Sequence, residues 1–245
     1  MAAKEEKTLN RTTARIVGML YLAGFVFYLG GNILVQSVIT RPDHLAAVSA
    51  SSMLVALGAI GMLMAGIFDA AHGILMFPVL KPHNERAAIG YLGYRIFDGV
   101  LLAVGVVFLL LQIPLGREYM AAGAAGAPSL QALSAVSLQA HLYAYEIAMI
   151  LVGIAGVLLC SVLYKARLLP RFLAAWGVVG YVVHLGGSAL TVMGFDLALM
   201  HTIPGGLWEL FIAIWLIAKG FNAPAAISSP DSAAIREEAA HLPAA

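Results

Sequence analysis

Apolar residues are arranged along this chain in six long runs, separated by short polar or charged stretches. A helix needs about 20 apolar residues, within a range of about 17 to 25, to cross the bilayer core. Each run is long enough, and three are longer than one crossing requires, which predicts tilted helices or interfacial ends. The predicted spans are residues 16 to 38, 53 to 80, 87 to 112, 133 to 163, 171 to 193 and 203 to 219.

This pattern predicts an all-α fold, a polytopic membrane helix bundle with six transmembrane helices. We expect residues 1–15 to form an N-terminal segment, residues 16–221 the transmembrane domain, and residues 222–245 a flexible tail. The composition agrees, because only 11% of the residues are charged, against about 25% in a typical soluble domain. The net charge of +1 provides no basic field that would attract a nucleic acid, so we expect no nucleic-acid partner.

The basic residues predict the orientation of the bundle. Eleven of the fourteen Lys and Arg residues lie in the two terminal segments and in the second and fourth connections, whereas the odd connections hold only Arg41 and Arg117. The positive-inside rule therefore places both termini in the cytoplasm. The first apolar run exceeds the roughly 7 to 15 residues of a signal peptide, so we interpret it as a span. The long third connection, "PLGREYMAAGAAGAPSLQ", is expected to lie along the membrane interface.

Four charged residues lie deep within three of the predicted spans. At about 1.5 Å of helical rise per residue, Asp69 and Asp98 lie about 18 Å from the nearest basic boundary residue, Glu209 about 15 Å and Arg95 about 13 to 14 Å. An isolated Arg at the bilayer centre costs at least about 2.5 to 3.5 kcal/mol. Arg95 therefore needs a partner, which Asp98 offers at i+3 on its own helix and Asp69 at similar depth on another.

Small residues surround three of the polar positions. Asp69, Glu209 and His184 each have Gly, Ala or Ser at positions three and four residues away, on the same helical face. Membrane helices approach one another on such faces. We therefore expect these three side chains to face the interior of the bundle and not the lipid.

Acidic residues outnumber the single buried arginine, and Glu146 adds a further acid nearer the outer face. A buried carboxylate without a cationic neighbour must be protonated, hydrated or bound to a cation. We therefore expect a transporter or a proton- or cation-coupled conductor, which would contact the lipid bilayer and a small ion or small-molecule ligand, and which is compatible with an oligomer. The candidate binding or relay residues are Asp69, His72, Arg95, Asp98, Glu146, His184 and Glu209.

Two other functions fit the same residues. Asp69 and His72 share a helical face in a spacing that resembles half of a di-metal carboxylate site, which would suit a membrane-embedded enzyme acting on a lipid or small apolar substrate. Such a metal centre would also draw on His184 and Glu209. Alternatively, Arg95 ties helices together in a structural or regulatory subunit. Walker, GxGxxG, HExxH, GxSxG and CxxC motifs are missing from the sequence, and the lone Cys160 excludes an intrachain disulfide.

Four stretches occur in an order that points to a known family: "RTTARIVGMLYLAG", "FPVLKPHNERAAIGYLGYRIFDGV", "LPRFLAAWGVVGYV" and "IPGGLWELFIAIWLIAKGF". Over roughly residues 11 to 222 the chain resembles a bacterial family of six-helix membrane proteins that is catalogued as a domain of unknown function. The resemblance implies the six-helix arrangement and the importance of Arg95 and Glu209. It implies no activity. We expect the protein in the plasma membrane of a bacterium, crossing it several times.

Overall fold

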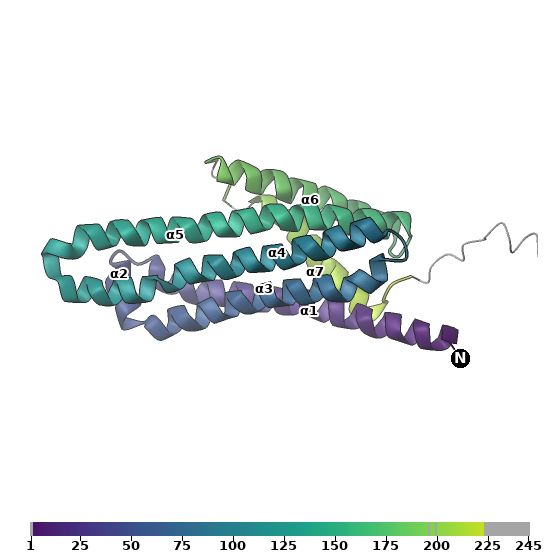
Figure 1. Ribbon diagram of the computed structural model, residues 1–245, viewed down its shortest axis with the longest axis horizontal. Helices are drawn as coiled ribbons and strands as arrows, with labels where there is room; N and C mark the ends of the chain where they lie inside the picture. The colour runs from purple at the N-terminus through teal and green to yellow at the C-terminus, as the bar shows by residue number, and fades with distance from the viewer. Residues whose placement is uncertain (1, 196, 199, 223–245) are drawn as a thin grey trace, which may run out of the picture.

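The computed structural model describes residues 2–195, 197–198 and 200–222, and the predicted tail beyond Asn222 lies outside these residues. All regular structure within this part is helical (Figure 1). The elements are α1 (Ala2–Ile39), α2 (His44–Ala50), α3 (Ser52–Leu80), α4 (Glu85–Leu110), α5 (Gln112–Lys165), α6 (Arg171–Val192), the short 3₁₀ helix η1 (Met200–Thr202) and α7 (Ile203–Ala218).

Six stretches of helix are long and apolar enough to cross a membrane, which confirms the predicted all-α bundle with six spans. The chain is therefore a multi-pass membrane protein. The spans are Arg11–Ile39, Ser52–Leu80, Glu85–Ala122, Gly126–Lys165, Arg171–Val192 and Met200–Ala218.

The third connection differs from the sequence-based expectation. Residues 112–132 are helical and form, with the rest of α5, a long helical hairpin that projects at the left of Figure 1, beside α2. Alanine has the highest helix propensity of all residues, so an Ala-rich stretch extends a helix as readily as it lies at an interface. The third and fourth spans consequently reach 38 and 40 residues.

The six spans form a ring in which each helix packs against its neighbours in the chain. Contacts join α1 to α3, α3 to α4, α4 to α5, α5 to α6 and α6 to α7, and α7 closes the ring against α1. Within the described residues, no Cα atom of α1 lies within 8 Å of a Cα atom of α5 or α6. The backbones of α1 and α5 are therefore separated, and α6 and α7 stand between them in the ring.

Glycine pairs bring neighbouring backbones together. A Cβ atom on Gly58 of α3 would lie 2.6 Å from the carbonyl oxygen of Gly31 in α1, and one on Gly99 of α4 would lie 2.7 Å from that of Gly66 in α3. Both distances are far below van der Waals contact, so no larger residue fits at these crossings. Close approach through small residues is the usual way in which membrane helices associate.

The two ends of the ring are packed differently. We call the end that carries Lys81, Lys165, Arg171 and Lys219 the basic end, and the opposite one the far end. The largest apolar core lies toward the basic end, where it joins residues of all six long helices, α1, α3, α4, α5, α6 and α7, around the fully buried Trp208. Trp208 also donates a hydrogen bond of 2.7 Å to the carbonyl oxygen of Leu173. This core closes the ring on the basic side.

Candidate functional site

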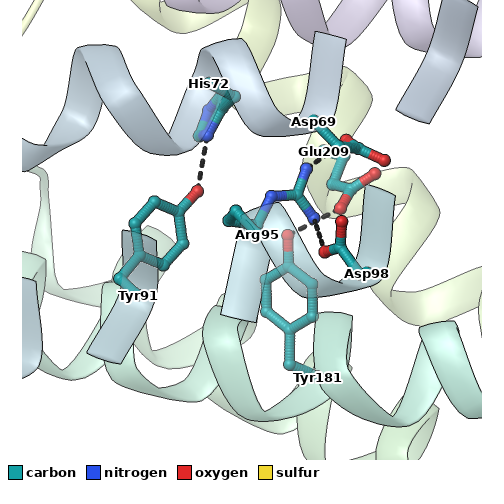
Figure 2. Close-up of polar contacts among 7 residues, drawn as sticks. All are labelled: Asp69, His72, Tyr91, Arg95, Asp98, Tyr181 and Glu209. Atoms are coloured by element: carbon teal, nitrogen blue, oxygen red, sulfur yellow. Dashed lines mark hydrogen bonds and ion pairs between the residues drawn. The ribbon is translucent and has the colours of Figure 1, made fainter. Parts of the chain in front are cut away.

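Arg95 of α4 lies between two aspartates inside the ring (Figure 2). Its Nη2 donates to Asp69 Oδ1 of α3, and its Nη1 lies 3.2 Å from Asp98 Oδ2, one turn further along α4. Asp98 is fully buried, whereas the Asp69 side chain keeps 27% of its surface exposed. The arginine therefore has the acidic partners that a cation at this depth needs. Asp98 is the enclosed partner, and Asp69 is the partly exposed one.

The contact between α3 and α4 places this triad. A Cβ atom on Gly73 would lie 2.8 Å from Arg95 Cβ, so only glycine lets the arginine stem pass across α3 at this level. Gly73 follows Asp69 by four residues, and Gly66 precedes it by three and packs against the Gly99 backbone. The small face predicted around Asp69 is thus the surface on which α4 and its arginine lie.

Glu209 of α7 is held by a tyrosine of α6. The Tyr181 hydroxyl donates a hydrogen bond of 2.7 Å to Glu209 Oε1, as Figure 2 shows. Gly205 lies against Gly180, where a Cβ atom would lie 3.1 Å from the Gly205 backbone, so α7 begins close against the middle of α6. Glu209 is partly exposed and has no ion pair in the described part of the chain. It is therefore the acid of this level that Arg95 does not engage directly.

His72 lies among aromatic side chains. Its Nδ1 forms a hydrogen bond of 2.5 Å with the Tyr91 hydroxyl, and the Tyr21 ring stands edge-on with its centroid 4.3 Å away. Tyr21 in turn contacts the Trp208 ring. His72 thus lies between the closed apolar core and the depth of Asp69, Arg95, Asp98 and Glu209, which we call the charged level.

A second polar group lies nearer the far end. His201 of η1 forms a 3.1 Å hydrogen bond through Nε2 with the Ser188 hydroxyl of α6, and the same nitrogen lies 3.8 Å from Glu146 Oε2 of α5. The His184 ring lies 5.8 Å from that of His201, centroid to centroid. These residues come from three elements, and sequence spacing gives no sign that they meet.

One cavity of about 340 Å³ joins both groups. Six of the seven candidate residues line it, and the enclosed Asp98 does not. Leu20 to Gln36 of α1 form one wall, about 24 Å long at 1.5 Å per residue, and α5 contributes the opposite wall. The far part of the cavity lies between α1 and α5, whose Cα atoms stay more than 8 Å apart in the described residues, while the rings of Tyr28 and Tyr145 stack across the gap. The cavity lining candidates are Asp69, His72, Arg95, Glu146, His184 and Glu209.

The proposed metal centre has no counterpart in the described residues, where no three His, Cys, Asp or Glu side chains gather in a way that could hold an ion. Asp69 instead engages Arg95, and the Nδ1 atom of His72 engages Tyr91. The carboxylate and imidazole that share a helical face thus turn to different partners.

The comparisons with known proteins point to one family. A family model described as "Domain of unknown function (DUF4386)" matches residues 16–220, which is most of the chain. The chain belongs to this family. No curated protein and no solved structure matches it. Membership agrees with the resemblance seen in the sequence and carries no activity with it.

Sequence reasoning missed several residues of the site. Tyr91, Tyr181 and His201 supply partners to the buried polar groups, and Asn32 and Gln36 line the far part of the cavity. The two amides were detectable, because they are the only Asn and Gln within the first apolar run, four residues apart and on one helical face. The tyrosines gave no such sign, because aromatic residues also serve as apolar packing.

Proposed function

We propose that this protein is a transporter in which the intramembrane cavity binds the transported species and Glu209 exchanges a proton or cation. The observation that carries the proposal is the cavity itself, since an ionisable carboxylate in the wall of an open intramembrane space is the usual mark of an ion or proton pathway. The cavity is also large enough for a small molecule, because ligand sites begin at about 300 Å³.

The packing at the two ends supports a transport cycle. The core around Trp208 closes the basic end, whereas the cavity runs toward the far end as far as Gln36. A carrier needs access from one side at a time, and this arrangement corresponds to one such state. The other state would require the core between α1 and α7 to open while α1 moves against α5.

The orientation is part of the proposal. We propose that the basic end lies in the cytoplasm of a bacterium, that the membrane is the plasma membrane, and that the cavity opens outward, because basic residues concentrate at that end. Lys81→Cys and Arg117→Cys, each in a Cys160→Ala background, test this with an impermeant maleimide on intact cells. We expect only the cysteine at position 117 to be labelled. Labelling of position 81 alone would reverse the orientation.

The test of transport is flux into proteoliposomes. With the native protein, a pH or cation gradient should produce a flux that a fluorescent indicator inside the vesicle reports, and Glu209→Gln should abolish it because the amide cannot exchange a proton or bind a cation. Glu118→Gln is the matched control, because it makes the same change at an exposed position of α5. Equal flux with native protein and Glu209→Gln would refute the role of Glu209.

A further inference from the structure

Three side chains in the cavity wall hold polar atoms without a hydrogen-bond partner in the described structure: Glu146 Oε2, His72 Nε2 and His184 Nε2. Each side chain is more than nine-tenths buried. The nearest imidazole nitrogen to the Glu146 oxygen is His201 Nε2, and 3.8 Å is too long for a hydrogen bond. Leaving such atoms unpaired in a protein interior is costly. The atoms themselves have almost no accessible surface, so a guest in the cavity would reach them after a small rotation of side chains that already line it.

The charges around the cavity favour a positive guest. Three carboxyl groups line it, those of Asp69, Glu146 and Glu209, against one guanidinium. Arg95 is already engaged by Asp69 and by the enclosed Asp98. A cation in the cavity would therefore be attracted by more groups than repel it. An anion would be repelled by the same carboxylates. Low-dielectric walls strengthen this preference.

The remaining wall favours an organic cation over a bare metal ion. Five aromatic side chains line the cavity, and aromatic faces attract ammonium groups while covering apolar surface. Calcium and magnesium instead need a shell of oxygen ligands, and the described residues gather no group of three His, Cys, Asp or Glu that could hold an ion. The aromatic lining residues are Tyr21, Phe25, Tyr28, Phe68 and Tyr145.

We propose that the cavity binds a small organic ammonium ion. The N–H groups of the ligand donate to the unpaired Oε2 of Glu146, and its apolar body lies against the aromatic wall. Tyr28 and Tyr145 stack across the space between α1 and α5 with ring centroids 5.5 Å apart, and they line the same cavity as Glu146, so their rings cover the ammonium group. The inference rests on the proposed function in taking this ligand as the transported species.

The test is equilibrium binding to the full-length protein in detergent micelles, with radiolabelled 2-phenylethylammonium as the probe. The neutral analogue 2-phenylethanol and the anion phenylacetate serve as competitors of similar size. We expect saturable binding of one probe per chain. The affinity of unlabelled 2-phenylethylammonium in competition should exceed that of the alcohol about tenfold or more, because a hydrogen bond to a charged group contributes more free energy than a neutral one. Phenylacetate should not compete. Equal competition by the ammonium and the alcohol would overturn the inference, and this comparison needs no variant.

Variants then locate the site. Glu146→Gln should weaken probe binding about tenfold or more, because the amide keeps the shape and removes the charge. Glu118→Gln, on the exposed face of the same helix, should bind the probe as the native protein does. Unchanged binding by folded Glu146→Gln would overturn the assignment of that carboxylate.

Binding and flux separate the two proposals. Probe binding without Glu209-dependent flux would support the ammonium site and overturn the transporter. Glu209-dependent flux without probe binding would support the transporter and overturn the ligand class.

Discussion

Removal of Arg95 should destabilise the bundle strongly. Arg95 is buried at 5% exposure, and its guanidinium is the only basic group within 4 Å of either Asp69 or Asp98 among the described residues. Arg95→Met keeps much of the length and apolar volume of the stem but leaves two carboxylates without their cation. Breaking a buried ion pair by removing one partner costs about 3–5 kcal/mol.

Most of that cost should come from Asp98. Its side chain is fully enclosed, and its Oδ1 already lacks a hydrogen-bond partner, so water cannot replace the guanidinium. Asp69 faces the cavity with 27% of its surface exposed and can be hydrated there. The double variant Arg95→Met, Asp98→Leu removes the enclosed carboxylate together with its cation, and apolar replacement of a whole buried pair is often nearly neutral. We therefore expect the double variant to recover most of the loss, to within about 1–2 kcal/mol of the native protein.

The assay is reversible unfolding in mixed micelles with increasing SDS, followed by tryptophan fluorescence, which the buried Trp208 should report. We compare the free energy of unfolding of three proteins: the native one, the single variant and the double variant. All three are fitted with the same dependence of that free energy on SDS. A double variant as unstable as the single one would refute the reasoning, because the loss would then come from the shape and packing of the arginine and not from an uncompensated charge.

Two further predictions concern packing and a polar network outside the charged level. Gly156→Ala places a Cβ atom 2.2 Å from the Tyr181 ring and should cost about 1–3 kcal/mol in the same unfolding assay, whereas Gly93→Ala, which meets nothing within 4 Å, should cost nothing; equal stability of the two variants would contradict the close packing. Ser134→Ala removes the 2.6 Å hydrogen bond to the buried Gln112 side chain and one to a histidine of α2, so it should cost about 1–3 kcal/mol. Native stability of that variant would show that the network contributes nothing.

The bundle was predictable from sequence because its determinants are local. A run of apolar residues long enough to cross the bilayer is recognisable within one segment, and so is the cost of a charge inside it. Counting residues from the basic boundaries placed Asp69 and Arg95 at one level, and the structure joins them in an ion pair. The small residues around Asp69 indicated which face meets another helix, though not which helix.

The cavity was not predictable, because it lies between α1 and α5, which are distant in the chain and whose backbones stay apart in the described residues. It lies where the backbones of α1 and α5 stay more than 8 Å apart, and the short α7, of 16 residues, is one of the two helices that stand between them in the ring. No local pattern in α1 or α5 reports the length of α7. The partners of Glu146 and Glu209 were missed for the same reason, since the contacts with His201 and Tyr181 are set by where η1 and α6 lie in the ring.

The structural and the transport interpretations of the charged level apply to different residues. Arg95 and Asp98 are enclosed and bound to each other within α4, and the ion pair of Arg95 with Asp69 ties α4 to α3. Glu209 and Glu146 line the cavity and are not bound to Arg95 within 4 Å, so removing their charge leaves no cation unpaired. Arg95→Met should therefore change the free energy of unfolding, whereas Glu209→Gln should change flux with far less effect on stability. If Glu209→Gln destabilised the bundle as much as Arg95→Met, all the charged residues at this depth would serve stability. The proposal that the cavity carries a transported ion would then be refuted.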